Sequence, residues 1–256
     1  MGAQLWIQVL IVYGIFSHTT SKRIVGGEVV DISTCGWQVS LQDGEEHLCG
    51  GSIINKNWIV TSAQCVQDGD TNDLTIRTGS SYHNSNGNVY EVTDIVLHPK
   101  FNIRTFDYDV ALVKVKNPIK LTVCNSRPVN LANEQYETPV GSLVYVTGWG
   151  ANQTEGNDSS ELLGAWIPLI DSSVCQSNYA EPGKPDRITD RMLCAGSAKG
   201  DGFCHGDYGG PLVDKNRKLI GIVSWGTHCG QSDKPGVYTK VNHPEILEFI
   251  LTKSSD

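Results

Sequence analysis

The eight cysteines are the side chains with the most obvious chemistry in this sequence of 256 residues. Their number is even and high, which favours disulfide bonds formed in an oxidising, extracellular compartment. The sequence contains no Cys-x-x-Cys pair, the close spacing at which many proteins bind zinc. We therefore expect disulfides, no metal site and no cofactor.

Two further motifs carry possible chemistry outside the cysteines. The acidic stretch 68–73 does not match an EF-hand loop, and we interpret it as a solvated turn. Asn152 (Asn-Gln-Thr) and Asn157 (Asn-Asp-Ser) begin glycosylation sequons in a Gly/Asn-rich segment that we expect to be an exposed loop. Both asparagines are therefore possible glycosylation sites.

The composition predicts a folded globular protein. Hydrophobic residues make up 39% of the chain and charged residues 19%, which excludes a disordered or coiled-coil protein. The formal charge is −8 at pH 7, whereas a nucleic-acid-binding surface needs basic residues. Nucleic acid is therefore not an expected partner.

The amino terminus has the pattern of a secretory leader. The apolar run Leu5–Phe16 is too short for a membrane span, which needs about 20 residues, and small polar residues follow it. We expect a signal peptide over about 1–17, a short propeptide over 18–23, and a secreted, extracellular protein that does not sit in a membrane. The alternative is a buried amino-terminal strand or helix.

The rest of the chain consists of short β-rich runs between Gly, Asn, Asp and Pro clusters, which indicates β-barrels or a β-sandwich. The apolar spacing becomes helical only in the last segment, where Ile246, Leu247, Phe249 and Ile250 share one face. The expected strands lie near 38–42, 47–54, 58–63, 74–78, 89–97, 110–115, 142–148, 165–170, 191–195, 210–214, 218–225 and 236–241.

Several motifs in order give the chain a specific resemblance. They are Ile-Val-Gly-Gly from residue 24, Trp-Ile-Val-Thr-Ser-Ala-Gln-Cys over 58–65, Asp-Val-Ala-Leu over 109–112, Gly-Asp-Tyr-Gly-Gly-Pro over 206–211 and Val-Ser-Trp-Gly over 223–226. The chain resembles the trypsin/chymotrypsin family of serine peptidases from residue 24 to about 253. The resemblance implies an all-β fold with two six-stranded antiparallel β-barrels, over about 24–134 and 135–242, and a carboxy-terminal helix over about 243–253.

The resemblance also exposes two departures at the catalytic positions. Where active members carry histidine and serine, this chain has Gln64 and Tyr208, and only Asp109 is kept. A glutamine amide forms hydrogen bonds but does not shuttle a proton, and a phenol oxygen lies too far from the backbone to replace a serine oxygen. His205 is expected at the cleft rim. We therefore predict a pseudoprotease, that is, no enzyme.

The remaining site residues follow from the resemblance. The backbone amides of Gly206 and Tyr208 would form an oxyanion hole, and the Gln64 amide is expected to donate to Asp109. Because Phe203 follows Gly202, where trypsins carry an acid, preference for Lys or Arg would be lost. We expect the Tyr208 ring to occlude a substrate pocket formed by Gly202, Ser224, Trp225, Gly226 and Gly236.

The elements of zymogen maturation are present. In the family, cleavage after a residue such as Arg23 frees the Ile24 amine, which pairs with Asp207; the alternative is that Asp207 is kept only as a folding contact. The family pairs six cysteines as Cys49–Cys65, Cys175–Cys194 and Cys204–Cys229. We expect Cys35 and Cys124 to pair as well, with free thiols or an intermolecular link as alternatives.

The sequence as a whole is similar to the trypsin-like proteases of the group 3 mite allergen type. The loss of the catalytic histidine and serine at positions 64 and 208 resembles the scabies mite inactivated serine protease paralogues. That resemblance implies a protein of the gut lumen that binds host serum proteins and inhibits complement. By default we expect a monomer. One alternative is a decoy or regulator that binds active proteases and their inhibitors. A minor alternative is a residual serine peptidase.

Overall fold

The strands follow from the alternation of side chains along the sequence. In β5 (Leu74–Thr78), Leu74, Ile76 and Thr78 are buried and the two residues between them are half-buried. Successive side chains of a strand point to opposite faces, so one face of β5 enters a core and the other meets solvent.

The structure is a computed structural model that describes residues 27–151, 158–184, 186–227, 229 and 231–255. The expected signal peptide and propeptide, Arg23 and Ile24, and the sequons at Asn152 and Asn157 lie outside the described residues.

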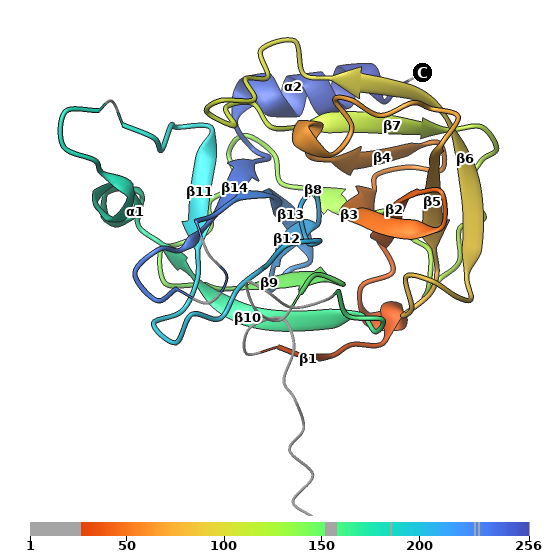
Figure 1. Cartoon of the computed structure of the whole chain (residues 1–256), viewed down its shortest axis with the longest axis horizontal. Helices are drawn as coiled ribbons and strands as arrows, with labels where there is room; N and C mark the ends of the chain where they lie inside the picture. The colour runs from red at the N-terminus through yellow and green to blue at the C-terminus, as the bar shows by residue number, and fades with distance from the viewer. Residues whose placement is uncertain (1–26, 152–157, 185, 228, 230, 256) are drawn as a thin grey trace, which may run out of the picture.

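The first barrel closes through six antiparallel strands in the order β2-β3-β4-β7-β6-β5 and forms the right-hand half of Figure 1. Its core contains Val39, Ile59, Ile76 and Val113, none of which is exposed. The strands are β2 (Gln38–Asp43), β3 (Glu46–Ile53), β4 (Trp58–Thr61), β5 (Leu74–Thr78), β6 (Asn88–Leu97) and β7 (Ala111–Val115).

The second barrel has the order β9-β10-β11-β14-β13-β12, and it closes because β9 pairs with both β10 and β12. Its strands are β9 (Leu143–Gly148), β10 (Leu163–Ile170), β11 (Met192–Ala195), β12 (Pro211–Asp214), β13 (Lys218–Trp225) and β14 (Gly236–Lys240). Two short strands extend the sheet: β1 (Glu28–Val29) pairs with β10, and β8 (Asn130–Leu131) runs parallel to β13. The expected two-barrel fold is confirmed.

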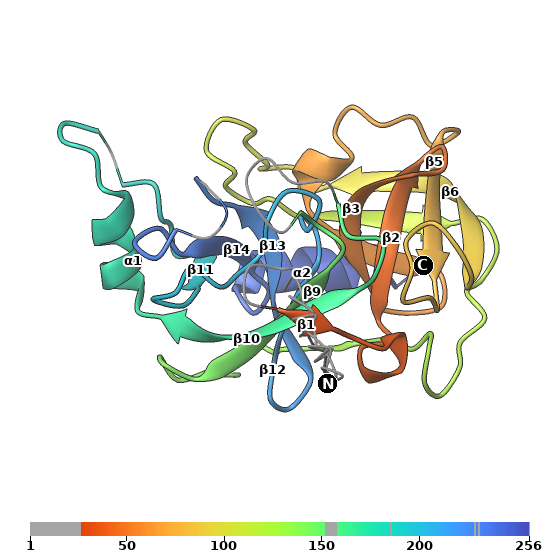
Figure 2. The same cartoon turned by 60° about the horizontal axis from the view of Figure 1, so that its bottom comes forward.

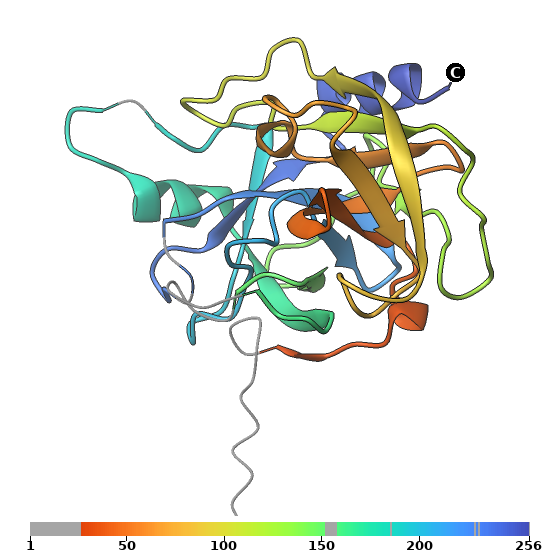
Figure 3. The same ribbon diagram turned by 45° about the vertical axis from the view of Figure 1, so that its right-hand side comes forward.

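Helix α2 (Pro244–Lys253) ends the fold as predicted. It has proline in its first turn, a position that proline tolerates because no intrahelical donor is needed there. Its apolar face packs into a buried cluster that also contains Trp58 of the first barrel and Ile222 of the second. Figure 3 shows α2 against the first barrel, so the carboxy-terminal segment helps to hold the two barrels together.

Helix α1 (Ser172–Tyr179) was not predicted from the sequence. Asp171 caps it by accepting hydrogen bonds from the amides of Ser173 and Val174. Its apolar periodicity is weak, and only Cys175 and Tyr179 are buried. The helix is therefore held by its cap and by the disulfide from Cys175 rather than by a broad apolar face. Two short 3-10 helices, η1 (Ile32–Thr34) and η2 (Ala63–Cys65), complete the described elements.

Three disulfides join the pairs that the resemblance implies. They are Cys49–Cys65, Cys175–Cys194 and Cys204–Cys229.

The expected fourth disulfide is absent, because Cys35 and Cys124 are both free thiols in the structure. Cys35 is 1% exposed and points into the core, whereas Cys124 is exposed in a loop. The two backbone segments are instead bridged by the Arg127 guanidinium, which donates to the carbonyls of Thr34 and Cys124. Burial raises the pKa of the Cys35 thiol to about 11. The expectation of a Cys35–Cys124 bond is wrong for this structure.

Neither of the two α-helices in the described part of the chain is long and apolar enough to cross a membrane.

Candidate functional site

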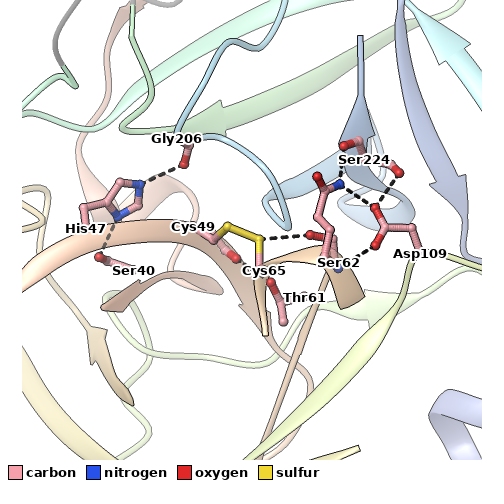
Figure 4. The surroundings of a disulfide bond; sticks show 11 residues. Ser40, His47, Cys49, Thr61, Ser62, Cys65, Asp109, Gly206 and Ser224 are labelled. Carbon is pink, nitrogen blue, oxygen red and sulfur yellow. Dashed lines mark hydrogen bonds between the residues drawn. A yellow bond between two sulfur atoms is a disulfide. The ribbon is translucent and has the colours of Figure 1, made fainter. Parts of the chain in front are cut away.

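Gln64 lies in η2, directly after β4, and the Cys49–Cys65 disulfide ties this short helix to β3. The Gln64 backbone amide donates to Oδ1 of Asp109 at 2.9 Å, and its Nε2 donates to Oδ2 at 2.6 Å. Nε2 also donates to the Ser224 carbonyl of β13. The Gln64 amide thus donates to both Asp109 and Ser224, and its contact with Asp109 is the one predicted from the sequence. Figure 4 shows Asp109 and Ser224 close together at this site.

Asp109 is fully buried, and its position depends on a tightly bent loop. Phe106 and Tyr108, just before it, have φ angles of 55° and 53°, in the left-handed region that residues other than glycine seldom adopt. Burial raises the pKa of Asp109 to about 6, and hydrogen bonds from Ser224 and Gln64 oppose that rise. Because Ser224 Oγ donates to Oδ2 at 2.6 Å, three donors from two residues surround this carboxyl group.

Tyr208 lies in a turn that only glycines can flank. Gly206 and Gly209 have φ angles of 88° and 76°, and a Cβ on Gly209 would lie 2.0 Å from Oγ1 of Thr61. The half-buried Tyr208 hydroxyl lies 3.1 Å from Nδ1 of His205, which is exposed at the rim. Burial and the nearby Asp207 raise the pKa of Tyr208. Sequence reasoning placed His205 at the rim but missed its contact with Tyr208.

The expected substrate pocket is largely filled, but by the Phe203 ring and not, as predicted, by the Tyr208 ring. A Cβ on Gly236 would lie 2.4 Å from Cε1 of Phe203, and one on Gly226 would lie 3.5 Å from Cζ. The Phe203 ring therefore lies between these two glycines, and Tyr208 meets it edge-on with ring centroids 6.0 Å apart. The remaining cavity is about 30 Å³, which is space for roughly one water molecule.

Two of the expected pocket residues lie elsewhere. Gly202, Gly226 and Gly236 line the cavity together with Phe203 and Tyr208. Ser224 instead contacts Asp109, and Trp225 packs edge-on against Tyr179. The prediction that Ser224 and Trp225 form the pocket wall is therefore wrong. The signal that could have identified Phe203 is its size, because a phenylalanine beside a glycine pocket floor must place its ring somewhere nearby.

Asp207, the expected partner of the Ile24 amine, is also fully buried. Its carboxylate accepts hydrogen bonds from the backbone amides of Gly150, at 2.8 Å, and Cys204, at 2.9 Å. Burial raises the pKa of Asp207 to about 7. Because Ile24 lies outside the described residues, pairing with its amine stays a prediction.

His47 is a further residue of this region that sequence reasoning missed. Nε2 lies 2.8 Å from the Gly206 carbonyl, and Nδ1 lies 2.8 Å from Oγ of Ser40. Burial lowers the pKa of His47 to about 4, so the imidazole is neutral at pH 7. A neutral ring that donates through Nε2 must accept from Ser40 through Nδ1. His47 thereby connects the first barrel to the turn that carries Tyr208 (Figure 4).

The described residues contain no cluster of three or more histidine, cysteine or acidic side chains suited to a metal ion. The backbone amides of Gly206 and Tyr208, expected to form an oxyanion hole, donate no hydrogen bond to another described residue.

Two closed barrels with a buried aspartate at their junction, next to a tight glycine-flanked turn, are the architecture of a chymotrypsin-type serine peptidase. The sequence model of the trypsin family matches residues 24–250. The chain therefore belongs to the trypsin family.

Relatives with known names agree with this family. "Trypsin 5G1" of Aedes aegypti is 39% identical over 87% of this chain and 82% of its own length. "Vitellin-degrading protease" of Bombyx mori is 40% identical over 86% and 82%. "Trypsin" of Simulium vittatum is 42% identical over 87% and 92%.

These relatives contradict the interpretation that the chain is not an enzyme. Proteins about 40% identical to it over most of its length are named as trypsins, which points to a serine peptidase. The interpretation depended on two positions alone, Gln64 and Tyr208, whereas the likeness to these relatives extends over 86–87% of the chain.

Proposed function

We propose that this trypsin-family protein binds another protein, and that its partners are host serum proteins of the complement system. The observation that carries the proposal is the filled pocket. Because Phe203 and Tyr208 leave only about 30 Å³, a partner would contact the outer surface around the cleft instead of inserting a side chain. In the cleft, Gln64 and Asp109 are already hydrogen-bonded to one another.

Charge and compartment support the same proposal. Loss of residues 1–23 would remove Lys22 and Arg23 and lower the formal charge from −8 to about −10. A strongly acidic protein attracts partners with basic patches. Three disulfides suit the extracellular location that the leader predicts. The departures at Gln64 and Tyr208, which are the basis for the likeness to the scabies mite paralogues, support complement as the partner class.

A second candidate function is the regulation of peptidases or their inhibitors. The relatives named as trypsins favour it, because an inhibitor that recognises trypsins could also recognise a chain about 40% identical to them. Such a role needs an inhibitor that tolerates a filled pocket. The two candidates therefore differ in whether opening the pocket improves binding.

The test is affinity capture from serum with the purified secreted protein, read by mass spectrometry. We expect saturable enrichment of complement proteins that excess untagged protein displaces. Phe203→Ser, which opens the pocket, is the matched control: complement capture should not change with it. Capture of peptidase inhibitors that rises with Phe203→Ser favours the second candidate. Absence of saturable complement capture contradicts the first.

The same preparations also measure function. The protein should inhibit complement-dependent lysis of antibody-coated erythrocytes at concentrations at which capture saturates. Release of a fluorogenic peptide product, measured in parallel, shows whether hydrolysis accompanies binding. Capture without inhibition of lysis would contradict complement inhibition and leave only binding.

A further inference from the structure

A groove of about 660 Å³ lies away from the cleft, between the β1–η1 segment and the turn that joins β12 to β13. Figure 2 shows β1 and the turn that joins β12 to β13 near the bottom of the molecule. The groove is within the size range of small-ligand sites, about 300–1,000 Å³. None of the residues discussed for the cleft lines it.

Aromatic rings form much of its surface. Tyr145 of β9 and Trp166 of β10 are cross-strand neighbours, with ring centroids 4.8 Å apart and planes tilted by 33°. Trp166 is 52% exposed, an unusual position for so large an apolar side chain. A Cβ on Gly164 would lie 2.2 Å from the Tyr145 hydroxyl, so the absence of a side chain there leaves room for this ring. The buried Trp37 also lines the groove.

The rim carries charges of both signs in equal number. Glu28 and Asp31 stand on the β1–η1 wall, and Lys215 and Arg217 stand on the opposite turn. Within the described part of the chain, none of these four takes part in an ion pair. Arg217 has a φ of 59°, a left-handed conformation that side chains rarely adopt outside turns and functional sites.

A third carboxylate, Asp214, also lines the groove, but the turn holds it and it is not exposed at the rim. It is 4% exposed, and it already accepts hydrogen bonds from the backbone amides of Asn216 and Lys218 and from the Tyr136 hydroxyl. Its bonding capacity is taken up by the turn that it holds. The groups left for a ligand are the Glu28 carboxylate, the second oxygen of Asp31, whose Oδ1 accepts from the Ser33 amide, two cationic side chains and the aromatic rings.

We propose that this groove binds a neutral saccharide of about two sugar units. The flat, aliphatic face of a sugar ring can pack on an exposed aromatic ring, whose body is apolar. Each hydroxyl both donates and accepts hydrogen bonds, so it can use carboxylates as acceptors and Lys or Arg as donors. An ionic ligand of either sign would meet two like charges at the rim. The saccharide can be free or part of a glycoprotein, and this proposal does not depend on the proposed function.

The test is saturation-transfer NMR and calorimetry on the secreted protein with maltose, cellobiose, lactose and N,N′-diacetylchitobiose. We expect saturable binding of at least one of them, with Kd on the order of 0.1–10 mM. Trp166→Ala should weaken that binding at least tenfold. The matched control is Leu143→Ala, which removes a side chain 56% exposed on neighbouring β9 but outside the groove, and it should leave Kd unchanged.

A second variant and two further probes complete the experiment. Arg217→Ser should weaken saccharide binding several-fold without changing the melting temperature by more than a few degrees. A sulfated disaccharide should bind more weakly than its unsulfated form. Ovalbumin before and after enzymatic removal of its glycans then shows whether a protein-linked glycan binds as the free sugar does. No saturable disaccharide binding, or binding that Trp166→Ala leaves unchanged, overturns the proposal.

Discussion

Asp109 and Asp207 are two fully buried carboxylates whose surroundings differ. Burial raises both pKa values, to about 6 and about 7. Asp109 accepts hydrogen bonds from two side chains, those of Gln64 and Ser224, as well as from a backbone amide. Within the described residues, Asp207 accepts only from the backbone amides of Gly150 and Cys204.

The difference shows that a buried carboxylate can obtain its hydrogen-bond donors in two ways. Asp109 receives donors from Gln64 of the first barrel and Ser224 of the second, so its hydrogen bonds form when the two barrels pack together. Asp207 has no side-chain donor among the described residues, which is the situation expected of a group that awaits a cation. The prediction that the freed Ile24 amine supplies this cation fits that environment and has its own test below.

The largest expected effect is a gain in esterase activity, from a double variant that tests whether Asp109 can orient a general base. Gln64→His combined with Tyr208→Ser places an imidazole beside Asp109 and a small hydroxyl in the glycine-flanked turn. We expect hydrolysis of p-nitrophenyl acetate to rise about 10²–10⁴-fold over the parent protein, the usual contribution of a positioned general base. This small ester avoids the space filled by Phe203. Adding Asp109→Asn should remove the gain, and a gain that survives it would show that Asp109 has no part in it.

The next effect concerns Asp207 after cleavage at Arg23. If the new Ile24 amine pairs with Asp207, Asp207→Asn leaves a buried cation unpaired and should cost about 3–5 kcal/mol in unfolding free energy. Urea unfolding of the cleaved parent and the cleaved variant measures this cost. Arg23→Gln, which cannot be cleaved at that position by a trypsin, provides the uncleaved reference. An equal cost in cleaved and uncleaved protein would argue against the pairing.

In the uncleaved chain, replacing Asp109 should cost more unfolding free energy than replacing Asp207. Asp109→Asn turns an acceptor into a donor that faces the donors of Gln64 and Ser224, and it should cost about 2–3 kcal/mol. Asp207→Asn spoils one of two backbone hydrogen bonds and should cost about 1 kcal/mol. Urea unfolding at pH 7 compares the two, and equal costs would mean that the side-chain donors around Asp109 add nothing.

The smallest expected effect is the pH dependence that His47 contributes. Its pKa is about 4 in the folded protein, against about 6.5 in an unfolded chain. Between these values the unfolded chain binds a proton that the folded protein does not, so His47 lowers stability as pH falls. The parent should therefore lose about 2 kcal/mol relative to His47→Gln between pH 7 and pH 4. A constant difference across this range would show that His47 titrates normally.

Much of the fold could be predicted because it depends on local patterns. The twelve β-rich runs correspond to the twelve barrel strands with shifts of a few residues at their ends, and the apolar face of residues 246–250 lies in α2. Helix α1 was missed because a cap and a disulfide hold it, and neither leaves a strong apolar period. The short strands β1 and β8, two residues each, carry no pattern long enough to detect.

The candidate site could be predicted only in part, for a related reason. The resemblance to the trypsin family placed Gln64, Asp109 and Tyr208 at one cleft, and the amide–carboxylate contact followed from the cost of leaving a buried charge unpaired. The direction in which the Phe203 ring turns, and the contact between Tyr208 and His205, depend on which neighbours leave space for each side chain. The pairing of Cys35 with Cys124 was inferred from an even count, which says nothing of where two thiols point.

The amino-acid sequence by itself determined the approximate positions of the twelve barrel strands, through their short β-rich pattern, and the family, through the order and residue types of its motifs. The family resemblance in turn implied the two-barrel fold, the residues of the cleft and the pairing of six cysteines. Only the tertiary structure decided that Phe203 fills the pocket, that Arg127 takes the place of a fourth disulfide, and that Tyr145 and Trp166 line a separate groove. These features arise where segments distant along the chain meet, and the outcome there is set by the space and hydrogen-bonding groups that one segment leaves to another.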